Sequence, residues 1–125
     1  MTYNIRLGIP EMAEFWKRLN AKVADGSAGK DERALYQKIG KAMKLLATDP
    51  RHPGLQSHEI GSLTKRYGGI KVWESYLENN TPSAGRLFWV YGPGKGDITI
   101  IGVEPHPSDK GNAYRRITLS DMGAN

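Results

Sequence analysis

The side chains best suited to chemistry lie in the second half of the chain. Arg86 opens an otherwise apolar run, His106 and Tyr114 follow it downstream, and Glu74 lies in the preceding apolar run. Cleavage of RNA by its own 2′-hydroxyl requires a base at that oxygen, a cation over the phosphate oxygens and an acid for the leaving 5′-oxygen. His, Glu and Tyr can transfer these protons, and the planar fork of Arg matches phosphate. The four residues therefore suit phosphodiester chemistry that needs no metal.

A structural interpretation of the same residues stays open. Arg86 can form an ion pair with Glu74, and His106 can be an ordinary loop residue. The other two histidines, His52 and His58, are scattered beside prolines or polar residues, and there is no cysteine. The phosphate-loop, dinucleotide-binding and H-E-x-x-H motifs are absent. We therefore expect neither a metal nor a cofactor.

The elements that would position these residues centre on a hairpin. Two apolar runs, Arg86–Tyr91 and Asp97–Val103, flank the turn sequence Gly92-Pro93-Gly94-Lys95-Gly96. Strand-forming runs on either side of a Gly/Pro cluster predict two antiparallel strands. Because nearly every residue of both runs is apolar, we expect both faces to be covered, as in central strands.

The first half of the chain predicts a strand and two helices. Tyr3–Leu7 alternates apolar and polar residues, which favours a half-buried strand. From Met12 to Val23 apolar residues recur at helical spacing after Pro10, a residue suited to the first turn. A second amphipathic helix is expected from Lys30 or Asp31 until Asp49, which precedes a proline.

The middle of the chain predicts strands separated by loops. Leu55–Ile60 is expected to be a short edge strand, Gly61–Gly69 an irregular loop and Ile70–Leu77 a strand. Helices come first and strands afterwards. This order predicts an α+β fold in which an N-terminal strand and a two-helix hairpin pack on one face of a mainly antiparallel sheet of four to five strands.

The length, net charge and composition of the chain limit the number of domains and the kind of partner. The chain has 125 residues and a formal charge of +5. This length indicates a single domain over residues 1–125, with residues 120–125 as a tail that can fray. The positive charge favours an acidic partner such as nucleic acid. Neither a membrane span nor a signal peptide is recognisable, and cysteine is absent, so we expect a cytoplasmic protein without membrane attachment.

Several segments in order resemble one known family. These are the opening Tyr3–Leu7 strand and its following helix, the second helix ending in Asp49-Pro50 before His52-Pro53-Gly54-Leu55, Trp73, the Gly85–Tyr91 strand, and Ile98–Val103 leading to His106 and Tyr114. The chain resembles the RelE/ParE toxin superfamily of bacterial type II toxin–antitoxin systems, nearest the mRNA interferases of the RelE, YoeB and HigB branch.

The resemblance implies a small cytoplasmic toxin that cuts mRNA in the ribosomal A site without metal. Arg86 would hold the scissile phosphate, and His106 and Tyr114 would match the positions of a general acid or base. Glu74 would match the carboxylate base of some members. The RNA backbone would be bound by five basic residues, Lys65, Arg66, Lys71, Arg115 and Arg116. A cognate antitoxin protein would be the partner.

Two other functions remain open at this level. One is a ParE-like inhibitor of DNA gyrase that carries out no chemistry, although such members generally lack an acid–base set. The other is a relative without toxicity whose charged residues only bind RNA or protein.

Overall fold

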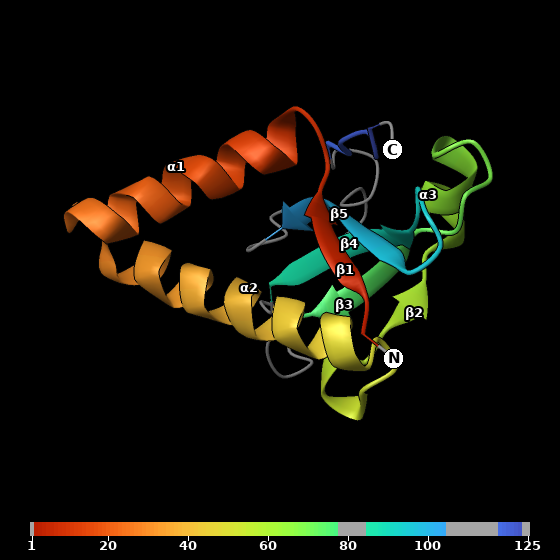
Figure 1. Cartoon of the computed structure of the whole chain (residues 1–125), viewed down its shortest axis with the longest axis horizontal. Helices are drawn as coiled ribbons and strands as arrows, with labels where there is room; N and C mark the ends of the chain where they lie inside the picture. The colour runs from red at the N-terminus through yellow and green to blue at the C-terminus, as the bar shows by residue number, and fades with distance from the viewer. Residues whose placement is uncertain (1, 78–84, 105–117, 124–125) are drawn as a thin grey trace.

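The computed structural model describes residues 2–77, 85–104 and 118–123 (Figure 1). His106, Tyr114, Arg115 and Arg116 lie outside these described residues. The elements in chain order are β1 (Asn4–Leu7), α1 (Glu11–Asp25), α2 (Lys30–Thr48), the 3-10 turn η1 (Pro53–Leu55), β2 (His58–Glu59), α3 (Gly61–Arg66), β3 (Trp73–Tyr76), β4 (Arg86–Tyr91) and β5 (Asp97–Glu104).

The strands form one five-stranded sheet in the order β1-β5-β4-β3-β2. β5, β4, β3 and β2 pair antiparallel, whereas β1 runs parallel to β5. The α+β class is confirmed, but the sheet is mixed where a mainly antiparallel one was expected. Residue alternation within a strand reports which faces are buried and carries no information on pairing direction. The direction of β1 is set by its partner, which lies some 90 residues further along the chain.

The predicted central hairpin is confirmed as β4 and β5. Its turn is closed by the Gly92 N–H, which donates to the Asp97 carbonyl at 2.8 Å, and by Thr99 Oγ1, which donates to the Gly92 carbonyl at 2.6 Å. Gly92 has φ +117°, a left-handed value that favours glycine. A β-bulge interrupts the ladder, because Phe88 pairs with Gly102 but Trp89 pairs with Ile100. This leaves Ile101 as the extra residue, which shifts the alternation of β5 by one.

The two predicted helices, α1 and α2, are confirmed and pack over one face of the sheet. This helix-side core joins buried residues of both layers, including Met12, Leu19, Ile39, Leu46, Leu87, Trp89, Ile98 and Ile100.

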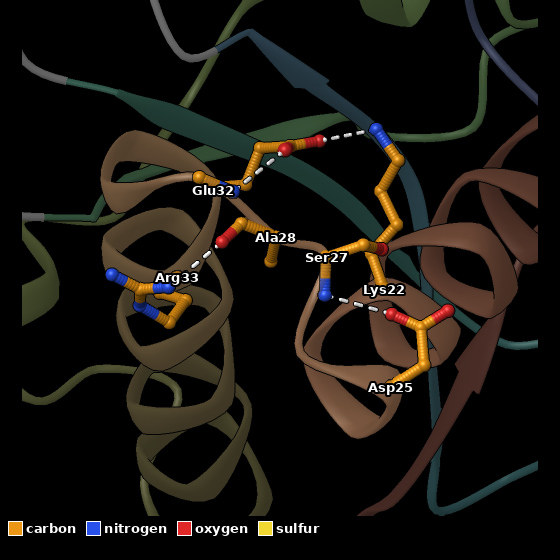
Figure 2. Close-up of polar contacts among 7 residues, drawn as sticks. Lys22, Asp25, Ser27, Ala28, Glu32 and Arg33 are labelled. Carbon is orange, nitrogen blue, oxygen red and sulfur yellow. Dashed lines mark hydrogen bonds and ion pairs between the residues drawn. The ribbon is translucent and has the colours of Figure 1, made fainter.

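Figure 2 shows how the sharp turn between the two helices is held. Glu32 accepts from Lys22 Nζ at 2.9 Å and from the Gly29 N–H at 3.0 Å. Arg33 donates to the Ala28 carbonyl at 2.7 Å, and the Ser27 N–H donates to Asp25 at 2.8 Å. Side chains therefore bind backbone groups of the three connecting residues Ser27, Ala28 and Gly29.

The opposite face of the sheet carries a second core and corrects one expectation. Gly61–Gly69 was expected to be an irregular loop, but Gly61–Arg66 forms α3. Six residues are too few to show an apolar repeat, so the helix has little local signal. It is stabilised instead by Leu63, which is buried against a cluster of Val72, Phe88, Val90 and Ile101.

The C-terminal segment 118–123 is tied into the same face. Ile9 and Asp121 exchange two backbone hydrogen bonds of 2.9 Å, and the Ser120 N–H donates to the Ile101 carbonyl at 2.8 Å. The Tyr67 hydroxyl donates to the Ser120 carbonyl at 2.7 Å. The first two residues of the expected tail, Ser120 and Asp121, are thus hydrogen-bonded, and residues 124 and 125 lie outside the described part of the chain. No helix among the described residues is long and apolar enough to span a membrane.

Candidate functional site

Three neighbouring strands bring four polar residues to one area of the second face. In the ladder, His58 of β2 lies opposite Glu74 of β3, and Tyr76 of β3 lies opposite Arg86 of β4. Side chains two residues apart on a strand share a face. His58, Glu74, Tyr76 and Arg86 therefore lie together, on the side of the sheet that α1 and α2 do not cover. Glu104 of β5 pairs with Arg86 from the other side.

Glu74 is the centre of this group, and we call Glu74, His58 and Arg86 the charged cluster. One oxygen of Glu74, Oε1, lies 3.0 Å from Nε2 of His58. The other, Oε2, lies 3.6 Å from the guanidinium of Arg86. The ion pair between Arg86 and Glu74, which the sequence left as one of two interpretations, is therefore present.

The exposure of these side chains is graded. Glu74 has no exposed surface, Arg86 is 18% exposed and His58 is 45% exposed. Burying a carboxylate without compensation is very costly, so the ion pair with Arg86 and the contact with His58 explain how Glu74 is tolerated there. A ligand can approach Arg86 and His58 from solvent, but it cannot touch Glu74.

The contacts of His58 restrict where its protons lie. Its Nδ1 is 2.9 Å from the Gln56 carbonyl oxygen, which can only accept, so Nδ1 carries a hydrogen. The other nitrogen, Nε2, faces the carboxylate of Glu74. His58 is therefore held between a backbone carbonyl and a buried carboxylate.

Tyr76 provides the aromatic wall of the cluster. Its ring centroid lies 5.9 Å from that of His58 and 6.0 Å from Cζ of Arg86. At this distance the guanidinium interacts favourably with the face of the ring. The arginine is therefore held on two sides, by a carboxylate and by an aromatic ring.

A chain of hydrogen bonds on the helix side fixes the register of these strands. Trp89 Nε1 donates to Ser75 Oγ at 2.8 Å, the hydroxyls of Ser75 and Ser57 lie 2.7 Å apart, and Ser57 donates to the Pro50 carbonyl at 2.9 Å. Ser57 and Ser75 are the immediate neighbours of His58 and Glu74. Because a slip of one residue would turn every side chain to the other face, this chain helps to hold the cluster in place.

The predicted site residues divide into three groups. Arg86 and Glu74 are brought together as described, and His106, Tyr114, Arg115 and Arg116 fall outside the described residues. The exposed Lys65, Arg66 and Lys71 lie on α3 and just before β3. Lys71 lies three residues before Glu74, and α3 directly follows β2, the strand that carries His58.

Sequence reasoning missed His58. The residue lies in a segment that was correctly expected to contain an edge strand, although the strand is only two residues long. Pairing this segment antiparallel with the next strand would have offered Glu74 as a partner, but the sequence does not give the register. Among the described residues, no three His, Asp or Glu side chains converge in a way that could hold a metal ion.

No protein-family model, no curated protein and no solved structure matches this chain. The site must therefore be interpreted from its own geometry.

Proposed function

We propose that this protein is a metal-independent endoribonuclease that acts on mRNA as the toxin of a type II toxin–antitoxin system. The observation that carries the proposal is the charged cluster: an arginine and a histidine, both reachable from solvent, joined by a buried carboxylate. The net charge of +5 suits a polyanionic substrate. The resemblance of several segments to the RelE/ParE superfamily supplies the toxin and ribosome part of the proposal.

In this proposal each residue of the cluster has a separate task. Arg86 binds the non-bridging oxygens of the scissile phosphate and stabilises the charge that grows there. His58 exchanges a proton with the substrate after its ring turns away from Gln56 or Glu74. Glu74 is a positioning residue, because it is fully buried and faces its two partners. This replaces the general-base role that the resemblance implied for Glu74.

The reaction is an internal transfer at phosphorus. The 2′-oxygen attacks the phosphorus as its proton leaves to a base, the bond to the 5′-oxygen breaks, and that oxygen takes up a proton. The products are a 2′,3′-cyclic phosphate and a 5′-hydroxyl end. A single 2′-deoxy nucleotide at the cut position should therefore abolish cleavage there.

The decisive experiment compares variants in cells and with purified ribosomes. Wild-type protein should arrest bacterial growth on induction and cut ribosome-bound mRNA, as detected by primer extension in the presence of a chelator. Arg86→Lys keeps the charge but loses the bidentate fork, so cleavage should fall at least about 100-fold. His58→Gln should lower cleavage by about 100-fold or more.

Arg18→Lys is the matched control, because Arg18 is exposed on α1 and far from the cluster in the fold. Its cleavage should equal that of the wild type. Growth arrest with intact mRNA and blocked DNA supercoiling would contradict the proposal in favour of gyrase inhibition. Folded wild-type protein that neither arrests growth nor cuts mRNA would contradict it altogether.

A further inference from the structure

A hollow of ≈ 500 Å³ lies where β1 starts and where α2 and β4 end. It is lined by Tyr3, Thr48, Asp49, Pro50, Arg51 and Tyr91, and we call it the tyrosine hollow. Tyr91 is two residues from Trp89 of the helix-side core, so its side chain is on the face of the sheet that α1 and α2 cover. The charged cluster is on the other face. The tyrosine hollow is therefore a separate feature, and its volume is within the range of sites that bind small molecules.

Backbone hydrogen bonds hold the walls of the tyrosine hollow in place. The Tyr3 N–H donates to the Ala47 carbonyl at 2.7 Å, which fixes the start of β1 beside the end of α2 (Figure 1). After α2, the His52 N–H donates to the Asp49 carbonyl at 2.9 Å, and the Arg51 N–H donates to Asp49 Oδ1 at 3.1 Å. The turn that carries Asp49 and Arg51 is thus ordered by its own hydrogen bonds.

Tyr91 offers a rigid aromatic surface to this hollow. Its ring centroid lies 5.7 Å from that of Tyr3, 5.1 Å from that of Trp89 and 6.3 Å from that of Trp73, and both tryptophan contacts are edge-on. Three neighbouring rings restrict the rotation of Tyr91, yet the residue remains 40% exposed. Aromatic side chains stack on unpaired bases of any identity. The ring of Tyr91 is therefore suited to stack on a flat ligand.

Two opposite charges lie near the hydroxyl of Tyr91. Burial, and then the neighbouring Tyr3, raise the pKa of Tyr91, which Arg51 lowers and Asp49 raises further. Both charged groups therefore act on the same part of the hollow. The carboxylate of Asp49 only accepts hydrogen bonds, and the end of α2 beside it carries the negative pole of the helix dipole, so this side suits N–H donors. The guanidinium of Arg51 suits a phosphate.

We propose that the tyrosine hollow binds one unpaired nucleotide, with its base stacked on Tyr91, the N–H edge of the base towards Asp49 and its phosphate on Arg51. A flat ring, an edge of N–H donors and an attached anion occur together in a nucleotide. Guanine is the expected base, because its neighbouring N1–H and N2–H groups can donate together to one carboxylate. The inference goes beyond the proposed cleavage and does not depend on it, since the charged cluster lies on the other face.

Titration of the isotope-labelled protein with guanosine 5′-monophosphate (GMP), followed by NMR chemical shifts, tests the inference with a probe that cannot be cleaved. The backbone N–H signals of Asp49, Arg51 and Tyr91 should shift and saturate. Inosine 5′-monophosphate lacks only the N2 amino group of GMP and should bind at least about fivefold more weakly. This difference should vanish in Asp49→Asn, which keeps an acceptor for the Arg51 N–H but loses the carboxylate.

Variants separate the phosphate contact from the stacking contact. Arg51→Gln should weaken binding of GMP about fivefold but leave binding of guanosine, which has no phosphate, unchanged. The matched control is Arg18→Gln, which removes the same charge from an exposed position on α1 outside the lining and should change neither affinity more than about twofold. Tyr91→Leu should weaken both probes at least about fivefold, whereas Tyr91→Phe keeps the ring and should stay within about twofold of the wild type.

Three results would overturn the inference. The first is folded wild-type protein whose signals at the tyrosine hollow do not respond to GMP. The second is an equal loss of GMP affinity in Arg51→Gln and Arg18→Gln, which would mean that only the net charge matters. The third is tighter binding of N-acetyltryptophanamide than of GMP at the same signals, which would assign the hollow to an aromatic side chain of a protein partner. Failure of the proposed function looks different, because mRNA would stay uncut while GMP still bound.

Discussion

Removal of Arg86 should destabilise the fold because it leaves Glu74 buried with one partner fewer. We consider Arg86→Met, which keeps most of the apolar stem and removes the guanidinium. The carboxylate of Glu74 has no exposed surface, so water cannot replace the lost interaction without a local rearrangement. His58 remains 3.0 Å away and compensates in part.

The size of the effect follows from the geometry. Two unit charges separated by 3.6 Å attract by about 4–5 kcal/mol at an effective dielectric constant of 20. Breaking a buried ion pair by removing one partner costs about 3–5 kcal/mol. Because His58 stays in place, we expect the lower end, about 3 kcal/mol. For a chain of 125 residues this corresponds to a fall in Tm of about 11 °C.

The double variant Arg86→Met/Glu74→Leu separates a buried charge from lost packing. When both partners become apolar, no charge is stranded, and such replacements are often neutral or stabilising. The double variant should therefore be more stable than the Arg86→Met single variant, although it carries one more substitution. Urea unfolding at pH 7, followed by tryptophan fluorescence and by circular dichroism, measures the three free energies of unfolding.

Two results would refute this reasoning. A loss below about 1 kcal/mol in Arg86→Met would mean that the other contacts of Glu74 compensate for the missing guanidinium, so that no uncompensated charge is left in the fold. A double variant less stable than the single one would mean that packing, and not the stranded charge, determines the cost.

Three further predictions concern parts of the fold away from the cluster. Gly8→Ala should lower the free energy of unfolding in urea by about 1–3 kcal/mol, because the new Cβ would lie 2.6 Å from the Ser120 Cβ. Gly40→Ala is the matched control: its new Cβ would meet no atom within 4 Å, so the free energy of unfolding should rise by about 0.5–1 kcal/mol. Burial, and then the nearby Asp121, raise the pKa of Tyr67. The contribution of Tyr67 to the free energy of unfolding is therefore complete below about pH 10 and is lost as pH rises through the folded-state pKa. The difference in the free energy of unfolding between wild type and Tyr67→Phe should shrink in that range. Hydrogen bonds from the Gly29 N–H and then from Lys22 hold the pKa of Glu32 below its ordinary 4.5. The higher stability of wild type relative to Glu32→Gln should therefore be complete above pH 4.5 and should disappear as pH falls through the lowered pKa. Thermal unfolding of both proteins across this pH range measures the difference.

The sequence alone determined most secondary structure. The bounds of α1, α2 and the β4–β5 hairpin follow from apolar periodicity and from Gly and Pro at the turns, which act within a few residues. The α+β class follows from the order of these elements. Short elements gave weaker signals: α3 has too few residues for a visible repeat, and β2 has only two.

The tertiary structure decided the direction of β1, the bulge at Ile101 and the composition of the site. Each depends on pairing between segments far apart in the chain, which alternation within a segment cannot specify. Arg86 and Glu74 were recognisable as charges within apolar runs. His58 was not, because its role comes only from the register of β2 on β3, and that register is fixed by side chains such as Ser57 and Ser75 on the other face of the sheet.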